Sequence, residues 1–327
     1  MNTLHRVAVV GQGVMGLTTA SKLLAAGFAV DIFSKEAFED TTSMAAGAYW
    51  WPHKAYPQER VSGWAKETYG EFVEASKDPD SGIHFEPHFR FCLDPDDGAY
   101  ARHLVDEWEE VNGADYGIPC HEAYHLQVPV IDVPVFMPFL KGQVESAGAT
   151  FYIRELASPA ELFPDYALVI NCTGVWARQF VNDQEVFPIR GQAIQLSNPT
   201  GLKTSTRIYQ KEDKFTLILP RTSDIILGGT AQEENWDRTQ SDADTKVILE
   251  RCRKIVPALK ESEVLSVSVG LRPGRAEVRL ELEEFDDGQP VIHNYGHGGG
   301  GYTVAWGCAN EVTQLATTYF AQKNEPA

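Results

Sequence analysis

The chain has 327 residues, of which 43% are hydrophobic and 23% charged, a composition typical of an ordinary globular protein rather than a disordered or fibrous one. Its formal net charge of −18 predicts an acidic surface that repels nucleic-acid phosphates and anionic lipid headgroups. Because no run of about eighteen apolar residues occurs and the first residues lack a signal-type apolar segment, we expect a cytoplasmic protein that binds neither nucleic acid nor membrane.

The beginning of the chain has the pattern of a strand, a glycine turn, a helix and a second strand. An apolar run at 6–10 precedes G-Q-G-V-M-G, and a second run at 28–33 follows apolar residues at helical spacing. In this setting the glycine motif predicts dinucleotide binding, because Gly11 permits the tight turn, Gly13 lets a pyrophosphate approach the backbone, and Gly16 lets the helix pack on the strand. The helix amino terminus would face the phosphates.

The end of the second strand leaves the nucleotide open. NAD enzymes carry an acidic residue there to hold the ribose hydroxyls, whereas this strand ends in Phe33-Ser34-Lys35-Glu36. Ser34 and Lys35 suit the 2′-phosphate of NADP, while Glu36 would be a displaced ribose partner in FAD. Local sequence therefore leaves both NADP and FAD open.

The remaining elements indicate two sheets. The polar and acidic region 56–124 resembles an insertion with a helix at about 61–77. The segment 166–171 predicts a buried parallel strand that ends in a small-residue turn, the kind of turn that faces ligands in open α/β sheets. Alternating segments between 193 and 228 predict antiparallel strands of a second sheet, and spacing predicts a last helix over 304–322.

One pentapeptide formally matches the zinc-protease motif H-E-x-x-H, from His121 to His125. That motif needs both histidines on one face of a helix. Here Pro119 precedes it and Gln-Val-Pro-Val follows at once, which predicts entry to a strand. The five cysteines are scattered without a C-x-x-C pair, so we expect neither a metal site nor a disulfide framework.

Seven segments, taken in order, resemble the D-amino-acid oxidase and D-aspartate oxidase family. They are 11–17, 41–52, 169–178, 190–192, 227–236, 270–281 and 293–309. The resemblance implies an α/β fold with a doubly wound Rossmann-type FAD-binding domain and a second, mixed or antiparallel-sheet substrate domain. We expect the FAD domain to be discontinuous, over 1–55, 130–192 and 268–327, with the substrate domain at 56–129 and 193–267.

The glycine run 298–301 would bring bare backbone next to a flat ligand and then start a helix whose positive end can stabilise an anionic reduced flavin. A flexible glycine loop is the alternative. By resemblance, Thr303 would bond the flavin ring and Gly299 would offer its carbonyl to the substrate amine. The cofactor-binding positions implied by the resemblance are Gly11, Gly13, Val14, Met15, Gly16, Ser34, Lys35, Thr41, Thr42, Ser43, Ala46, Gly47, Ala48, Leu156, Cys172, Thr173, Gly174, Gly191, Gln192, Gly298, Gly300, Gly301, Tyr302 and Thr303.

Arg272 matches the family arginine that holds the substrate carboxylate, a task suited to a planar guanidinium. With the carboxylate fixed, the resemblance implies hydride transfer from the α-carbon to flavin N5 without a side-chain base. The products would be a 2-oxo acid, ammonia and hydrogen peroxide. We expect FAD as cofactor and an amino acid and oxygen as partners, with homodimer formation left open.

The chain departs from the family at the substrate end. Leu217 stands where the oxidases usually carry a tyrosine that joins the arginine, and loss of such a charge-assisted bond costs roughly 1.5 to 3 kcal/mol. Tyr209 falls near the position of a lid tyrosine and either compensates or is an exposed loop residue. Ala231 stands where aspartate-specific members carry an arginine, so D-aspartate becomes a minor expectation.

Trp50, Trp51 and His53 are expected to form an aromatic wall of the substrate pocket, with core packing as the alternative for each. Such a pocket favours neutral or apolar amino acids. The competing functions are oxidation of glycine, a secondary amine or an unusual amino acid, an NADP-dependent dehydrogenase, and a flavin-binding protein without turnover.

Overall fold

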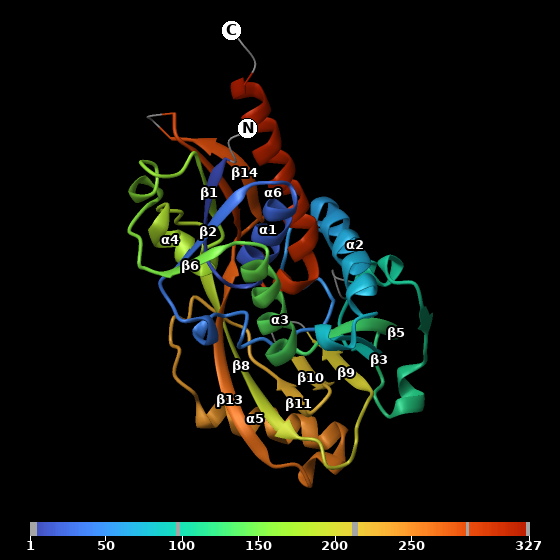
Figure 1. Cartoon of the computed structure of the whole chain (residues 1–327). Helices are drawn as coiled ribbons and strands as arrows, with labels where there is room; N and C mark the ends of the chain where they lie inside the picture. The colour runs from blue at the N-terminus through green and yellow to red at the C-terminus, as the bar shows by residue number, and fades with distance from the viewer. Residues whose placement is uncertain (1–4, 96–98, 211–214, 286–287, 325–327) are drawn as a thin grey trace.

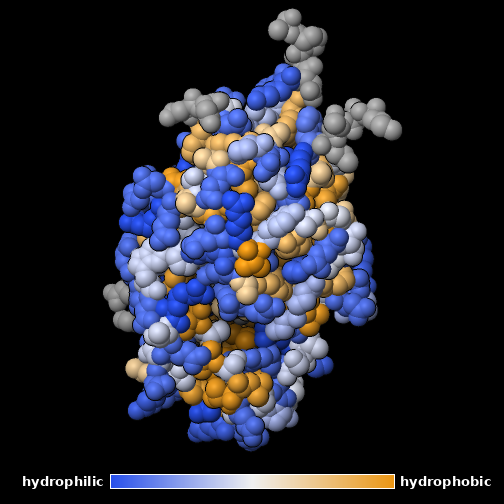
Figure 2. All heavy atoms as spheres, turned by 60° about the vertical axis from the view of Figure 1, so that its left-hand side comes forward, coloured by the Kyte–Doolittle hydropathy of each residue, from blue (hydrophilic) through white to orange (hydrophobic). Residues whose placement is uncertain are grey.

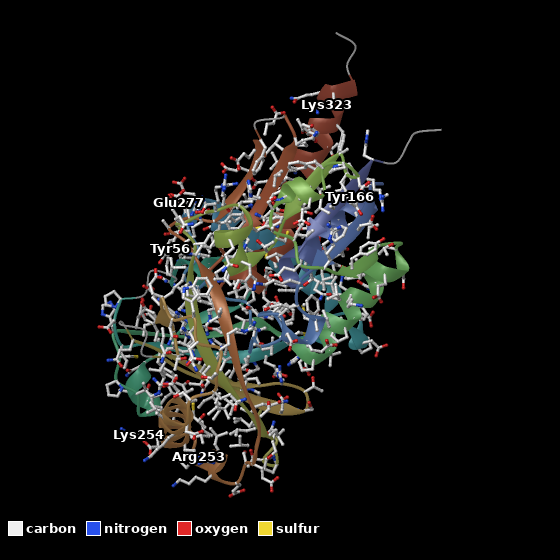
Figure 3. The ribbon with its side chains drawn as sticks, turned by 90° about the vertical axis from the view of Figure 1, so that its left-hand side faces the viewer. Tyr56, Tyr166, Arg253, Lys254, Glu277 and Lys323 are labelled. Atoms are coloured by element: carbon white, nitrogen blue, oxygen red, sulfur yellow. The ribbon has the colours of Figure 1, made fainter. Side chains whose placement is uncertain are left out.

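The computed structural model describes residues 5–95, 99–210, 215–285 and 288–324, whose strands form a six-stranded and a nine-stranded sheet. In Figure 1 the six-stranded sheet lies in the upper half of the molecule with β1 and α6, and the nine-stranded sheet lies in the lower half. Tyr166 lies beside the first sheet, whereas Arg253 and Lys254 at the end of α5 lie at the opposite end of the molecule (Figure 3). Within the described ranges no helix is both long and apolar enough to cross a membrane.

The six-stranded sheet has the order β14-β15-β7-β1-β2-β6 and is parallel except where β14 pairs with β15. Its centre is β1 between β2 and β7, so the expected buried parallel strand is confirmed at Leu168–Asn171. The strands are β1 Arg6–Val10, β2 Ala29–Ser34, β6 Thr150–Ile153, β7 Leu168–Asn171, β14 Arg279–Glu284 and β15 Pro290–Tyr295.

Strand β1 is buried on both sides because helices cover both faces of this sheet. Val7 and Val9 pack in the cluster that contains residues of α1 and α6, whereas Ala8 and Val10 pack with Phe180 of α4 on the other face. This alternation confirms the doubly wound prediction. The helices are α1 Val14–Ala25, α2 Gln58–Ala75, α3 Val133–Ser146, α4 Ala177–Phe180, α5 Asp242–Ile255 and α6 Gly301–Asn324.

The nine-stranded sheet runs β12-β8-β11-β10-β9-β3-β5-β4, with β13 on the other edge of β8. The antiparallel pairing of β9, β10 and β11 confirms the second sheet expected between 193 and 228. Helix α5 packs on one face through Ile248 and Cys252, which leaves the other face to border a cavity. The strands are β3 Ile83–Cys92, β4 Trp108–Glu110, β5 Glu122–Ile131, β8 Phe187–Ser197, β9 Ser205–Tyr209, β10 Phe215–Pro220, β11 Asp224–Gly228, β12 Gln232–Glu233 and β13 Val264–Gly274.

The region 56–124 is an integral part of the nine-stranded sheet, which corrects the expectation that it is an insertion. Its strand β3 lies within the nine-stranded sheet, paired with β9 on one side and β5 on the other. Its helix α2 packs along α6. The region is polar in sequence because α2 buries only one side and exposes the other, so composition alone could not reveal this position.

Helices α2 and α6 approach closely at one glycine. A Cβ on Gly307 would lie 2.4 Å from the Cα of Trp64, and the Gly307 amide donates to Thr68 Oγ1 at 3.1 Å. The indole of Trp64 also donates to Glu311 Oε2 at 2.7 Å. Since backbone atoms of α2 cannot move aside cheaply, this contact requires glycine.

Gly307→Ala is therefore expected to lower the free energy of unfolding by about 1 to 3 kcal/mol through overpacking, as measured by urea denaturation. Gly70→Ala is the matched control, because it also changes a helical glycine but has open space around it. That control should be neutral or stabilise by up to about 1 kcal/mol. Equal effects of the two substitutions would show that the close helix contact does not limit stability.

Candidate active site

A cavity of about 790 Å³ lies between the two sheets and is lined by both. Its walls come from the turn after β1, the segment 41–53, the turn after β7, strands β8 to β11 and β13, and the segment 297–302. The surface in Figure 2 is mostly hydrophilic, with apolar side chains gathered around a hollow in the lower half of that face. A ligand in the cavity would contact residues that are far apart in the sequence.

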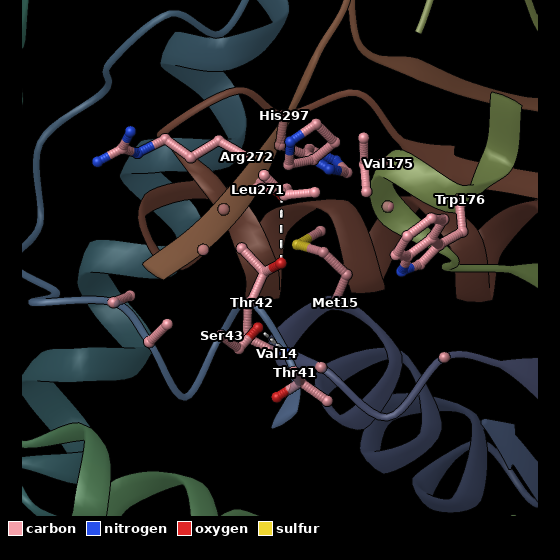
Figure 4. Close-up of a pocket in the computed structure, with 18 of the residues that line it drawn as sticks. Val14, Met15, Thr41, Thr42, Ser43, Val175, Trp176, Leu271, Arg272 and His297 are labelled. Atoms are coloured by element: carbon pink, nitrogen blue, oxygen red, sulfur yellow. Dashed lines mark hydrogen bonds between the residues drawn. The ribbon is translucent and has the colours of Figure 1, made fainter. Parts of the chain in front are cut away.

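Bare backbone surrounds the turn after β1. Gly11 has a φ of +121°, a conformation that favours glycine, and a Cβ there would lie 2.3 Å from the carbonyl oxygen of Cys172. A Cβ on Gly16 would lie 1.8 Å from the carbonyl oxygen of Gly11. The first-turn amide of Val14 donates to Ser43 Oγ at 2.9 Å (Figure 4). A backbone cradle at a helix amino terminus is what a dinucleotide pyrophosphate needs, so these residues fit FAD.

Most of the residues expected to bind the cofactor lie at the wall of this cavity. They are Gly11, Gly13, Val14, Met15, Ser34, Lys35, Thr41, Thr42, Ser43, Ala46, Gly47, Ala48, Leu156, Cys172, Thr173, Gly174, Gly191, Gln192, Gly298, Gly301 and Tyr302. Figure 4 shows that Thr41, Thr42 and Ser43 lie near the start of α1, with Leu271 and Arg272 on the strand above them. The Thr42 hydroxyl donates to the carbonyl of Leu271 at 3.2 Å, which links the 41–43 turn to β13.

Three of the expected cofactor residues lie behind the wall. Gly16 supports the turn from inside, and a Cβ on Gly300 would meet Ala55 at 3.1 Å. Thr303 is buried, and its hydroxyl donates to the carbonyl of Trp51 at 2.9 Å and accepts from the Trp51 amide at 3.1 Å. The hydroxyl of Thr303 thus joins α6 to the 41–53 segment, and its bond to the flavin ring stays a prediction.

Arg272 lies on β13 at the cavity wall, with its guanidinium over the neighbouring strand β8. A Cβ on Gly191 would be 2.3 Å from Nη1 of Arg272, so the glycine provides the space for this side chain. Nη1 donates to the carbonyl of Thr230 at 3.0 Å. On the opposite wall, the amide of Gly299 donates to the carbonyl of His53 at 2.9 Å. Arg272 and Gly299, both predicted to contact substrate, thus border the same cavity.

The aromatic wall is only partly as expected. Trp51, His53 and Leu217 line the cavity. Trp50 does not, because it is fully buried and donates through Nε1 to the carbonyl of Ala65 at 3.1 Å. Trp50 therefore takes the core-packing role, whereas Trp51 faces the cavity.

Tyr209 and Ala231 are not among the residues that line the cavity, and their contact with substrate stays a prediction. Tyr209 ends β9, and its ring lies 5.6 Å from the guanidinium carbon of Arg90, so it is not an exposed loop residue. Ala231 is buried in a cluster with Phe215. The residue that does face the cavity from β9 is Arg207, which motif comparison missed; its register opposite Leu217 is the signal that reveals it.

The cavity keeps its histidines neutral and is electropositive at the substrate end. Burial, followed by the charges of Arg207, Arg272, Lys54 and Arg90, holds the pKa of His53 well below its ordinary value of 6.5. The imidazole therefore carries no charge at neutral pH. These four charges are cationic, so they favour an anionic ligand at this end of the cavity.

The residues that suited NADP have partners within the protein. Ser34 Oγ donates to the carbonyl of Glu36 at 3.0 Å, and the ammonium of Lys35 lies 3.4 Å from the ring centre of Trp176. The carboxylate of Glu36 pairs with Arg238 at 2.6 Å. These contacts weaken the local case for a 2′-phosphate.

The H-E-x-x-H pentapeptide lies in an extended conformation, which confirms the predicted entry to a strand. His121 precedes β5 and His125 lies within it, where its Nδ1 is 3.0 Å from Glu109 Oε1 and its ring stacks on Phe89. The one-helix geometry of the protease motif does not occur here. Among the residues that the structure describes, no group of three or more His, Cys, Asp or Glu is placed to hold a metal ion.

Comparison with known proteins relates almost the whole chain to FAD-dependent oxidoreductases. The family model DAO, described as FAD dependent oxidoreductase, matches residues 6–315. A D-amino-acid oxidase of Rubrobacter xylanophilus is 39% identical over 312 residues, 95% of either chain. A D-aspartate oxidase of Homo sapiens is 31% identical over 328 residues, 95% of this chain and 94% of that one. These matches to FAD-dependent enzymes exclude the alternative of an NADP-dependent dehydrogenase.

Among solved structures, glycine oxidase from Geobacillus kaustophilus superposes with a TM-score of 0.78. The match covers 99% of this chain and 96% of that one at 19% identity. L-proline dehydrogenase from P. horikoshii gives a TM-score of 0.74 at 14% identity, with 98% and 95% covered. At these identities the likeness establishes the fold, and it confirms the expected pairing of a parallel and a mixed sheet.

Two buried histidines near the cavity should make the protein sensitive to acid. Burial lowers the pKa of His293 to about 4 and that of His297 to about 3, from an ordinary 6.5. The unfolded chain therefore binds more protons than the folded protein below about pH 6.5, so stability should fall as the pH drops through this range. His293→Gln should flatten the dependence of unfolding free energy on pH between 6.5 and 4, as measured by urea denaturation. Parallel curves for variant and native protein would contradict this assignment.

Proposed function

The chain belongs to the DAO family of FAD-dependent oxidoreductases, and on that premise we propose that it deaminates a D-amino acid oxidatively to a 2-oxo acid, ammonia and hydrogen peroxide. The observation that carries the proposal is Arg272 at the wall of the cavity that also contains the dinucleotide cradle. The relatives named D-amino-acid oxidase, at 35–39% identity, support the same substrate class.

We propose that the cofactor is held along the cavity by the wall residues named above, with the pyrophosphate at Gly11, Gly13 and the first turn of α1. The flavin end would lie between the 298–301 glycines and the nine-stranded sheet, next to Arg272. The amino terminus of α6 begins at Gly301 and contributes a positive partial charge there.

The side chains of the site bind and orient the substrate. A planar guanidinium such as that of Arg272 can hold an α-carboxylate by two parallel bonds, which fixes the rest of the amino acid relative to the flavin. The carbonyl of Gly299 would accept from the substrate amine. When bound, FAD takes up hydrogen and two electrons from the substrate and passes the electrons to oxygen. The pKa of His53, held well below its ordinary value by burial and neighbouring cations, makes it a weak base, and Leu217 is apolar, in keeping with a reaction in which the protein provides orientation.

We also propose that the six-stranded sheet with α1, α3 and α6 is the cofactor domain, over 1–55, 130–192 and 268–327, and that the nine-stranded sheet is the substrate domain. The strands of the first sheet all lie within those ranges. Strands β5, β8 and β13 of the nine-stranded sheet run across the boundaries at residues 130, 192 and 268, so the division cuts through that sheet at three places. The acidic charge of −18 fits a protein that works in the cytoplasm without adhering to anionic membranes.

The proposal is tested by adding D-amino acids, L-amino acids, glycine and secondary amines in turn to the yellow holoprotein without oxygen. Bleaching of the flavin band by a D-amino acid, reversed by air with formation of peroxide, is the expected result. Bleaching by glycine or a secondary amine alone would instead favour the related amine oxidases, to which the fold is also similar. A flavin that no compound bleaches would overturn the proposed reaction.

Arg272→Ala should raise the KM for the best substrate by about 100-fold or more while the protein stays yellow, because two charge-assisted bonds to the carboxylate are lost. The KM of Arg272→Lys should fall between those of the native protein and Arg272→Ala, since an ammonium keeps the charge but not the paired geometry. Arg253→Ala, at the far end of the molecule (Figure 3), is the control and should leave KM unchanged. An unchanged KM in Arg272→Ala would show that the carboxylate binds elsewhere.

A further inference from the structure

The segment that joins β11 to β12 contains one more residue than the stretch of β8 opposite it. Gly228, the last residue of β11, pairs with Ala193. Gln232, the first residue of β12, pairs with Arg190. Residues 229–231 therefore face only the two residues of β8 that lie between these pairs. Such a bulge interrupts the ladder of hydrogen bonds and leaves backbone groups to find other partners.

The hydroxyl of Thr230 takes up one of the backbone donors at this bulge. The amide of Gln192 on β8 donates to Thr230 Oγ1 at 2.9 Å. The carbonyl of the neighbouring Gly229 accepts from Nη2 of Arg251 on α5 at 3.0 Å. A Cβ on Gly229 would lie 2.7 Å from the carbonyl oxygen of Gln192, so the bulge packs directly on β8. The bulge is thus fixed to both β8 and α5.

Gln192 is itself held firmly. It is 1% exposed, and its Nε2 donates to the carbonyl of Ser241 and to the hydroxyl of Thr245, each at 2.9 Å. Its Oε1 accepts from the Ser241 amide at 2.8 Å. These bonds join β8 to the start of α5, so the residue that binds the Thr230 hydroxyl has a fixed place.

The bulge presents one carbonyl to Arg272. Nη1 of Arg272 donates to the carbonyl oxygen of Thr230 at 3.0 Å. Under the guanidinium, a Cβ on Gly191 would lie 2.3 Å from Nη1 and 2.4 Å from Nη2. Gly191 and Arg272 line the cavity, whereas Thr230 is not among the residues that line it. Thr230 therefore reaches a ligand through the guanidinium and not by direct contact.

We propose that Thr230 is a positioning residue for Arg272. Its hydroxyl fixes the bulge, and the bulge carbonyl orients the guanidinium in the space that Gly191 leaves open. This inference rests on the proposed function, in which Arg272 binds the α-carboxylate of the substrate. Two parallel bonds to a carboxylate need the planar guanidinium at one angle, so a small rotation loses one of them.

Thr230→Val tests the role of the hydroxyl, because valine keeps the shape of the side chain and removes the acceptor. We expect KM for the best D-amino acid to rise about 10-fold, measured by peroxide formation. The kcat should change by less than about twofold, since the carboxylate is bound in the ground state and the transition state alike. Thr230→Ser keeps the hydroxyl and should bring KM back to within about twofold of the native value. Flavin content and circular dichroism check the fold of each variant.

Thr245→Val is the matched control. It is the same substitution and also removes a bond to Gln192, but at the side-chain amide and not at the bulge. Its KM should stay within about twofold of the native value. A rise in KM equal to that of Thr230→Val would overturn the inference, because loosening of α5 would then account for both.

A second background shows whether Thr230 acts through Arg272. Arg272→Ala lacks the guanidinium that the bulge carbonyl holds, so Thr230→Val should add no further increase to its KM. The same fold increase in the native and Arg272→Ala backgrounds would mean that Thr230 acts on something other than Arg272.

Gly191→Ala tests the space under the guanidinium. The new methyl group meets only the far end of the Arg272 side chain, which can move away, so the protein should fold and stay yellow. The displaced guanidinium should raise KM about 10-fold. A native KM, or a protein that no longer holds flavin, would contradict the part assigned to Gly191.

A titration without turnover separates this inference from the proposed reaction. Butyrate, a simple carboxylate, is added to the holoprotein, and the shift of the flavin absorbance reports binding. Thr230→Val should weaken butyrate binding about 10-fold, and Arg272→Ala should weaken it further. If no D-amino acid bleaches the flavin but butyrate binding follows this order, the reaction is wrong and the role of Thr230 stands. If D-amino acids bleach the flavin while Thr230→Val changes neither KM nor butyrate binding, the reaction stands and the role of Thr230 is wrong. A native holoprotein that neither reacts with a D-amino acid nor binds butyrate would refute both.

Discussion

Close backbone contact around the cavity is the constraint on which the rest of the structure depends. At three places a single Cβ atom would collide with a carbonyl oxygen: Gly11 with Cys172 at 2.3 Å, Gly16 with Gly11 at 1.8 Å, and Gly298 with Lys54 at 1.9 Å. These contacts bring the turn after β1 against the turn after β7, and the segment before α6 against the residue that follows the 41–53 segment. Bare backbone at these junctions leaves amides and carbonyls as the surface that a flat, charged cofactor meets.

Side-chain bonds then tie the two sheets together across that junction. Thr303 joins α6 to Trp51, and Thr42 joins the same segment to β13. On the other side, Arg190 of β8 is 2% exposed and donates to the carbonyls of Asp237 and Thr239. The loop that Arg190 holds carries Arg238, whose ion pair with Glu36 reaches the end of β2 in the other sheet. Because Arg238 is partly exposed, that ion pair adds less to stability than the buried bonds of Arg190.

Local motifs predicted the turns, strands and helices that are determined by residues close together in the sequence. The glycine turn, the buried strand β7 and the last helix follow from spacing within short segments, and the structure has each of them. The differences from expectation concern single side chains. Tyr209 and Arg207 lie two residues apart on β9 and face the same side of the sheet, yet Arg207 lines the cavity whereas the ring of Tyr209 lies beside Arg90. Thr303 has the right position for a cofactor contact, but a neighbouring backbone takes its hydroxyl.

The positive charges at the substrate end of the cavity also explain how the cavity can bind an anion in a protein of net charge −18. An acidic surface slows the approach of an anionic substrate, so the attraction must come from charges that solvent does not screen. Arg207, Arg90 and Arg272 meet this need because they lie in or beside the cavity rather than on the surface. Burial and the same cations hold the pKa of His53 well below its ordinary value, so this histidine is neutral at neutral pH. The cations that favour binding of the anion therefore add to the effect of burial on the imidazole, and the site can hold a charged substrate beside a histidine that is neutral at neutral pH.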